Sequence, residues 1–160
     1  WNDKLELGRI NFHLNDMQGE FVHGWISDQA PHWLSSPNLE SPLFLIGRCP
    51  KRISIDGLLE KEKIKRVDIL HADAQECEVE LLWGAVNAIR DHKIKFIFLS
   101  THQKDHQQYI EFLSLLGYNI LQEFTIEETY FDDGLILACA PDVYEQIDTT
   151  KLTISRKEKE

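Results

Sequence analysis

Polar side chains that could do chemistry follow two strands that the sequence predicts to be buried. Asp73 follows the strand predicted over residues 66–72, and His102 follows the strand predicted over residues 94–100. A parallel sheet binds ligands outside the carboxyl ends of its strands, so both side chains are expected at the same edge. A carboxylate beside an imidazole orients the ring and adjusts its basicity. The sequence therefore predicts Asp73 and His102 as catalytic residues, either of which can be the general base.

Each of these residues also has a purely structural interpretation. Asp73 can cap the helix that begins near Glu76, because a carboxylate there satisfies the first helical N–H groups. A single histidine in a loop, such as His102, is commonly an ordinary surface residue. His71 has the same strand parity as Asp73 and is predicted to be a buried, hydrogen-bonded histidine. The sequence leaves both interpretations of Asp73 and His102 open.

Other chemistries find less support in the residue pattern. Asp73, Glu78 and His102 are metal-binding residue types, but their spacing matches no compact metal motif, so no metal is predicted. The chain contains no G-x-G-x-x-G, P-loop or G-x-S-x-G motif. Cys77 has no activating partner in the sequence and is predicted to be a buried thiol. A metal-dependent hydrolase that uses Asp73 and His102 stays an alternative.

Composition and charge narrow the class of protein. The chain has 160 residues, of which 42% are hydrophobic and 28% charged, as in an ordinary globular domain. The net charge of −10 argues against a nucleic-acid partner and suits a neutral or cationic small molecule. No apolar run approaches the roughly 18 residues of a membrane span, so no membrane association is predicted. An odd number of cysteines, three, suggests no disulfide framework, and we expect a reducing, cytoplasmic location.

The chain is predicted to hold one partial domain over residues 1–147 and a charged, frayed tail over residues 148–160. It begins Trp1-Asn2-Asp3-Lys4, without Met and without the basic and apolar regions of a signal peptide. We therefore expect the chain to begin inside a longer protein.

The N-terminal third combines a helix, a strand and a long loop. Helical spacing of Leu7, Ile10 and Leu14 predicts a helix over residues 4–15. A short buried strand is predicted over residues 20–27. The prolines of residues 29–43 predict a loop whose length is typical of lids or binding segments. Trp33 in this loop either covers a ligand or packs the loop down.

The rest of the chain alternates strands and helices and ends in a hairpin. Asp56 is predicted to cap a short helix, and the strand at residues 66–72 to be buried on both faces. Alternation of this kind predicts a parallel sheet with helices on both faces. The expected elements are strands at 51–55, 66–72 and 94–100, helices at 57–63, 76–90 and 104–116, and two strands within 118–140 that flank the turn Asp132-Asp133-Gly134. Val79, Leu82, Trp83, Val86 and Ile89 form the expected apolar stripe of the second helix, and Gly117 the stop of the third.

Residues 67–89, VDILHADAQECEVELLWGAVNAI, resemble the signature of FkbM-type methyltransferases. That signature is a strand ending in Asp, then Glu or Gln, Gly, a small residue and Glu, then a helix with Leu and Gly-Ala. The matching residues are Asp73, Gln75, Glu78, Leu82, Gly84 and Ala85. Further segments follow in the order of the family: Ser54-Ile55-Asp56, FLSTH at 98–102, Leu116-Gly117-Tyr118 and Asp133-Gly134-Leu135-Ile136. The resemblance spans about residues 5–141.

The resemblance implies a fold, a cofactor and a reaction. The fold is α/β, with the Rossmann-like sheet of class I methyltransferases, mostly parallel with a C-terminal antiparallel hairpin, in the strand order 3-2-1-4-5-7-6. The cofactor is S-adenosylmethionine, and the reaction is methyl transfer, expected to a hydroxyl of a small molecule or sugar. By position, Ser27 and Asp28 are expected to bind the cofactor, and Gln75 and Glu78 the substrate.

Two departures from the family put activity in question. Glu76 stands where the family has Gly, a residue that permits close backbone approach. The first two strands and their Gly-rich turn, which hold the methionine end of the cofactor, have no counterpart in the chain. The strand at residues 20–27 would then have no neighbour that links it to the strand at residues 66–72, and we expect the fragment to be inactive alone. The alternative is a non-catalytic binding or scaffold module, and either protein can form an oligomer.

Overall fold

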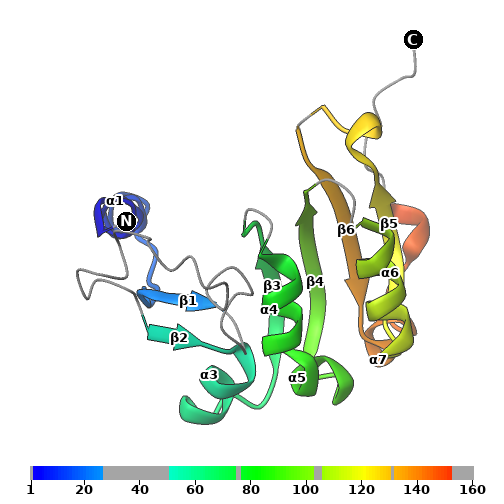
Figure 1. Ribbon diagram of the computed structural model, residues 1–160, viewed down its shortest axis with the longest axis horizontal. Helices are drawn as coiled ribbons and strands as arrows, with labels where there is room; N and C mark the ends of the chain where they lie inside the picture. The colour runs from blue at the N-terminus through cyan, green and yellow to red at the C-terminus, as the bar shows by residue number, and fades with distance from the viewer. Residues whose placement is uncertain (1, 27–50, 75–76, 103–105, 131, 153–160) are drawn as a thin grey trace, which may run out of the picture.

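The computed structural model shows two groups of elements, an N-terminal one and a larger C-terminal one (Figure 1). The structure describes residues 2–26, 51–74, 77–102, 106–130 and 132–152. The predicted loop at residues 29–43, with Trp33, lies outside these ranges. So does most of the predicted C-terminal tail.

The N-terminal group contains a helix and a two-stranded parallel sheet. Helix α1 (Asn2–Leu14) confirms the helix predicted there. Strand β1 (Gly24–Ile26) is shorter than the strand predicted over residues 20–27, and it pairs in parallel with β2 (Lys51–Ile53). The strand therefore has a neighbour, β2. In the described part of the chain, this small sheet has no hydrogen-bonded strand in common with the larger one. The prediction that no neighbour links residues 20–27 to the strand at residues 66–72 is confirmed for the described residues.

The larger sheet has four strands in the order β3-β4-β6-β5. Strands β3 (Val67–Ala72) and β4 (Ile94–Thr101) are parallel. Strand β6 (Gly134–Cys139) runs antiparallel to both β4 and β5 (Asn119–Phe124). This arrangement confirms the predicted parallel strands and antiparallel hairpin. The hairpin connection is longer than the predicted turn and includes the 3₁₀ helix η3 (Ile126–Glu128).

The helix predicted over residues 76–90 is divided in two. Helix α4 (Glu78–Gly84) ends at Ala85, and α5 (Val86–Arg90) begins directly after it. Trp83 was predicted in the buried stripe, but it is 54% exposed and its ring meets Phe112 edge to face.

The helix that follows β4 ends where the sequence predicts. Helix α6 (His106–Leu115) buries Tyr109 and Leu113 and stops before Gly117, whose φ of +85° favours glycine. In Figure 1, α4 and α6 lie on the same side of the four-stranded sheet.

The hydrophobic core occupies one face of this sheet. Side chains of β4 that point to that face, Ile97 and Leu99, are fully buried in one cluster with residues of α4, α5 and α6. The opposite face of β3 carries Ile69, which is 59% exposed, and His71, which is exposed. The predictions that β3 is buried on both faces and that His71 is buried are therefore wrong, because the described elements cover only one face of β3.

The N-terminal cap of the helix between β2 and β3 also differs from the prediction. Helix α3 (Ile55–Lys61) is capped by Ser54, whose Oγ accepts a hydrogen bond from the backbone N–H of Gly57 at 3.0 Å. Asp56, the predicted cap, lies in the first turn. Its carboxylate accepts hydrogen bonds from the backbone N–H groups of Asn87 and Ala88, at 2.9 and 2.8 Å. Asp56 therefore caps α5 from a different helix.

Two short elements follow β6 that the sequence did not predict. Helix α7 (Pro141–Tyr144) contributes Asp142, which forms an ion pair with Arg66, the residue before β3. A hydrogen bond from that guanidinium is the main cause that lowers the pKa of Asp142. The 3₁₀ helix η4 (Thr149–Lys151) is capped by Asp148.

Candidate functional site

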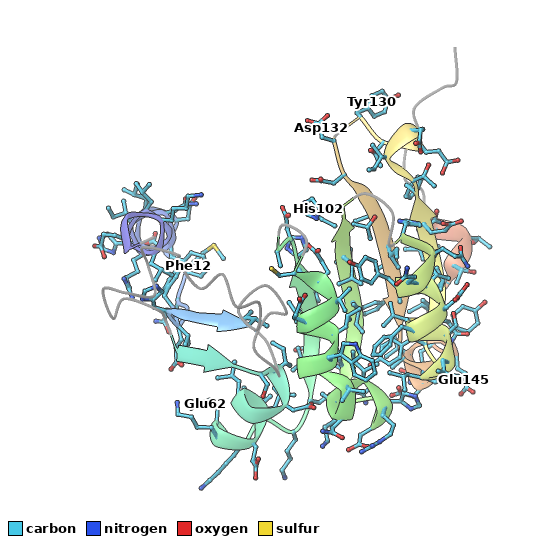
Figure 2. The ribbon with its side chains drawn as sticks, in the orientation of Figure 1. Phe12, Glu62, His102, Tyr130, Asp132 and Glu145 are labelled. Atoms are coloured by element: carbon cyan, nitrogen blue, oxygen red, sulfur yellow. The ribbon has the colours of Figure 1, made fainter. Side chains whose placement is uncertain are left out.

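His102 lies among three carboxylates at the carboxyl ends of β3 and β4 (Figure 2). Its Nδ1 is 3.1 Å from Oε1 of Glu78. Its Nε2 is 3.2 Å from Oδ1 of Asp133 and 3.6 Å from Oδ1 of Asp73. The imidazole is 11% exposed and Asp73 48% exposed, so the cluster opens to solvent on the side of Asp73. The predicted approach of His102 to Asp73 is confirmed.

Glu78 is the most deeply buried member of the cluster. It is the first residue of α4, and its side chain turns back so that Oε1 accepts a hydrogen bond from the backbone N–H of Ala74 at 2.8 Å. This bond joins the backbone of Ala74, the residue after Asp73, to the first residue of α4. The residue is fully buried, and its Oε2 has no hydrogen-bond partner among the described residues. A buried carboxylate oxygen without a partner is energetically expensive and calls for an explanation.

The end of β4 is held by a second polar chain that starts one residue before His102. Thr101 is buried, and its Oγ1 lies 2.7 Å from Nδ1 of His106. Nε2 of His106 is 3.0 Å from a carboxylate oxygen of Glu123. These contacts join β4, α6 and β5, and they fix the backbone direction from which His102 projects.

Asp133 is the member of the cluster that the sequence interpretation missed. The sequence placed it in a turn and gave it no role in a site. Register brings it there: Thr101 pairs with Gly134 across β4 and β6, so the next residue on β4 and the preceding residue on β6 meet. The strand order implied by the FkbM resemblance could have indicated this, because it places the last strand of the hairpin beside the strand that ends before His102.

Several predicted site residues lie outside the described residues. Ser27 and Asp28, predicted for the cofactor, and Gln75, predicted for the substrate, are among them, as is Glu76. Their predicted roles stay predictions.

The cysteines agree only in part with the predictions. Cys77, the residue before α4, is half-buried rather than fully buried. Cys139 on β6 is fully buried, and this burial raises the pKa of its thiol to about 11. A thiol of this kind stays protonated at neutral pH, so Cys139 is a packing residue rather than a nucleophile.

The geometry of the cluster supports two kinds of chemistry. An imidazole held by one buried carboxylate presents its other nitrogen as a proton acceptor. Three carboxylates around one imidazole also favour a positively charged ligand, because the carboxylates outnumber the one group that can carry a positive charge. Both kinds of chemistry need the same residues, and the fold alone does not choose between them.

The comparison with protein families decides the class. The family model of the methyltransferase FkbM domain matches residues 4–120. The chain belongs to the FkbM methyltransferase domain family. The matched part of this FkbM domain includes Asp73, Glu78 and His102 but ends before Asp133. The family performs S-adenosylmethionine-dependent methyl transfer.

No curated protein matches the chain at a significant level. Within the described ranges, the FkbM domain has no helix of the length and apolar character that a membrane crossing requires.

Proposed function

We propose that this FkbM domain, within the full-length protein, transfers a methyl group from S-adenosylmethionine to a hydroxyl of a small molecule or sugar. The observation that supports this proposal best is the cluster around His102 at the carboxyl ends of β3 and β4, the edge where parallel sheets bind ligands. Membership of the FkbM family supplies the reaction class.

The protein has a limited chemical task in such a reaction. S-adenosylmethionine, when bound, supplies a methyl group that its sulfonium already activates. The chain must align the acceptor, exclude water and accept the proton of the hydroxyl. Asp73 is half-exposed and suited to hold the acceptor hydroxyl, and either Asp73 or Nε2 of His102 accepts the proton. Glu78 lies 3.1 Å from Nδ1, and Nε2 faces the carboxylates of Asp133 and Asp73.

The charges of the site fit a positively charged cofactor. The sulfonium of S-adenosylmethionine carries a positive charge, and the cluster presents the carboxylates of Asp73, Glu78 and Asp133 at the edge of the sheet where the methyl group would meet the acceptor. In this proposal, Ser27 and Asp28 bind the adenosine part, and Gln75 and Glu78 lie on the acceptor side.

We further propose that residues 1–160 are inactive without the rest of the full-length protein. In the described part of the chain, β3 pairs with β4 alone, and the β1-β2 sheet is separate from the larger sheet. The FkbM resemblance implies two more strands between β1 and β3, which carry the turn that holds the cofactor. A chain without that turn lacks the main grip on the methionine end.

A non-catalytic module that keeps the FkbM fold is the second candidate. The observation in its favour is Glu76, which stands where the family has Gly, inside the segment that best matches the signature. A side chain at that position can fill the space that the cofactor or acceptor needs.

Calorimetric titration of the full-length protein with S-adenosylhomocysteine tests the proposal. We expect saturable binding by the full-length protein and none by residues 1–160. Glu76→Gly is the informative variant, because recovery of binding only in that variant would favour the non-catalytic module. A folded full-length protein that binds neither S-adenosylhomocysteine nor S-adenosylmethionine would overturn the methyltransferase proposal.

A further inference from the structure

We propose that Asp73, Glu78 and His102 form a binding site for a divalent metal ion. Each residue offers one ligand atom, and the three atoms lie within 4.8 Å of one another. Separations of this size suit ligands around one ion at the metal–oxygen and metal–nitrogen distances of about 2.0–2.5 Å that proteins use. The sequence predicted no metal because the three residues are unevenly spaced along the chain. The β3-α4 connection and the parallel pairing of β3 with β4 bring them together.

Glu78 is the residue that argues most directly for a ligand. It is fully buried, and the backbone N–H of Ala74 and the ring of His102 account for its Oε1. Its Oε2 is buried without a hydrogen-bond partner among the described residues. A carboxylate oxygen in such a place is normally hydrogen-bonded or bound to a metal, because a buried polar atom without a partner is destabilising. Coordination of a cation gives this oxygen the partner that the described protein atoms do not.

The surroundings of His102 match those of a metal-bound histidine. A histidine that binds metal through one ring nitrogen commonly donates the N–H of the other to a carboxylate. Here Nε2 lies 3.2 Å from Oδ1 of Asp133, and Nδ1 lies 3.1 Å from Oε1 of Glu78. Asp133 can therefore accept the N–H of Nε2 and fix the ring when Nδ1 binds the ion.

The ligand types indicate the kind of ion. Two carboxylates favour hard ions such as Mg²⁺ and Mn²⁺, whereas one imidazole favours Zn²⁺ and other transition metals. A mixed set of this kind suits Mn²⁺ or Zn²⁺ better than Mg²⁺, which prefers oxygen ligands only. The half-exposed Asp73 leaves the solvent side of the ion open to water or to an acceptor.

A bound ion would deepen the proposed function, and this one step rests on that function. A divalent cation lowers the pKa of a coordinated oxygen ligand, so an acceptor hydroxyl on it would lose its proton more readily. The three side chains would then act as ligands of the ion rather than as the base.

Titration of the full-length protein with Mn²⁺, after treatment with EDTA and dialysis, tests the site by calorimetry and by electron paramagnetic resonance. We expect saturable binding of a single Mn²⁺ that Zn²⁺ displaces. Asp73→Asn, Glu78→Gln and His102→Gln should each weaken binding about tenfold or more, the usual effect of disturbing a metal site. Asp132→Asn is the matched control, since Asp132 is an exposed neighbour of Asp133 and should leave binding unchanged. Absence of binding, or binding that all three variants retain, would overturn the site.

Thermal unfolding of Glu78→Gln gives a second measurement. The difference in Tm between the variant and the parent protein should have opposite signs in EDTA and in Mn²⁺. In EDTA the variant removes a buried charge and should raise Tm by about 2–4 °C. In Mn²⁺ the parent protein should gain stability that the variant does not. A variant that is less stable in EDTA and still binds Mn²⁺ would show that Glu78 is only a structural partner of His102, and the proposal would be wrong.

The two proposals fail separately. Mn²⁺ binding without S-adenosylhomocysteine binding would leave the metal site standing and remove the methyltransferase function. S-adenosylhomocysteine binding without Mn²⁺ binding would remove the metal site and leave the methyltransferase function standing. His102 or Asp73 would then remain the candidate base.

Discussion

Gly134 shows how tightly the residues behind the candidate site are packed. A Cβ atom at this position would lie 2.8 Å from the backbone oxygen of Phe124 and closer still to Oγ1 of Thr101. It would also lie 3.1 Å from Nδ1 of His106, so it would meet both partners of the Thr101–His106 contact. The absence of a side chain at Gly134 is therefore what lets β4, β5 and α6 meet directly behind His102.

We expect Gly134→Ala to destabilise the protein by about 1–3 kcal/mol, the usual effect of overpacking a buried site. The added methyl group must displace Thr101 or the backbone of β5, and neither is a flexible chain end. Urea unfolding followed by circular dichroism measures the difference in the free energy of unfolding. Ser114→Ala, on the exposed side of α6, is the control and should change it little. An unchanged free energy in Gly134→Ala would show that β4 and β6 can separate at this point.

At the scale of elements, Asp56 joins two helices that are distant in sequence. From the first turn of α3, its carboxylate accepts hydrogen bonds from the backbone N–H of Asn87 and Ala88 and from the side-chain amide of Asn87. Helix α5 has only five residues and no side-chain cap of its own. The Ser-Ile-Asp element of the resemblance therefore has a structural explanation: Ser54 caps α3, and Asp56 caps α5.

Loss of this cap should destabilise the C-terminal core, because α5 contributes Ala88 and Ile89 to that core. We expect Asp56→Ala to lower the free energy of unfolding by about 2 kcal/mol, since it removes charged hydrogen bonds to a helix N-terminus. Chemical denaturation measures the change. Glu60→Ala, an exposed position on the same helix, should have an effect within about 0.5 kcal/mol. Equal effects of the two substitutions would contradict the role of Asp56.

The pair of Arg66 and Asp142 connects the start of β3 to α7 and should contribute to stability in a pH-dependent way. The hydrogen bond from Arg66 lowers the pKa of Asp142 below its ordinary value of 3.8 in the folded protein. A lowered pKa means that the contribution is present above the ordinary value and disappears as the pH falls through the folded value. The difference in urea midpoint between the parent protein and Asp142→Asn should therefore be positive at pH 7 and shrink below pH 4.

The control for this prediction is Glu145→Gln, an exposed carboxylate just after α7. It should leave the urea midpoint at pH 7 close to that of the parent protein. A difference between the parent protein and Asp142→Asn that stays constant from pH 7 to pH 3 would contradict the ion pair.

Local pattern predicted most elements, and long-range packing decided the points that were wrong. Alternating strands and helices, the Gly117 stop and the antiparallel hairpin follow from periodicity and turn residues, which are properties of short segments. Burial of β3 on both faces does not, because a continuous apolar strand does not reveal which elements will cover it. Asp56 was misplaced for the same reason: both Ser54 and Asp56 are good caps, and only the packing of α3 against α5 distinguishes them.

The candidate site was predictable in part for a related reason. The position of Asp73 and His102 at neighbouring strand ends follows from the order of the elements. Asp133 was missed because its approach depends on the register of β6, which sequence pattern does not determine. The burial of Glu78 depends on a side chain that turns back to Ala74, which helical periodicity does not reveal.

At the scale of the whole molecule, the described elements leave apolar surface uncovered. On the face of β3 and β4 opposite the core, Ile69 is exposed and Phe96 and Phe98 are only half-buried. Helix α1 and the segment after it expose Leu7, Ile10, Leu14, Met17 and Val22. An apolar sheet face next to an unpaired strand edge is unusual in a stable isolated domain. If two further strands and their helices complete the FkbM domain, as we propose, the strands would pair with the edge of β3 and the helices would cover the apolar face.

Ile69 provides the test of this completion. Its side chain is 59% exposed in residues 1–160, so Ile69→Thr, which keeps a β-branched side chain, should change the free energy of unfolding by less than about 0.5 kcal/mol in that chain. In the full-length protein, further elements should bury the same side chain, and the substitution should then cost about 1.5–3 kcal/mol. Leu115→Gln is the control, because Leu115 is 85% exposed at the end of α6, away from the uncovered face. It should have a small effect in both proteins. If Ile69→Thr were equally harmless in the full-length protein, no element would cover this face, and the strand order implied by the FkbM resemblance would not apply to β3.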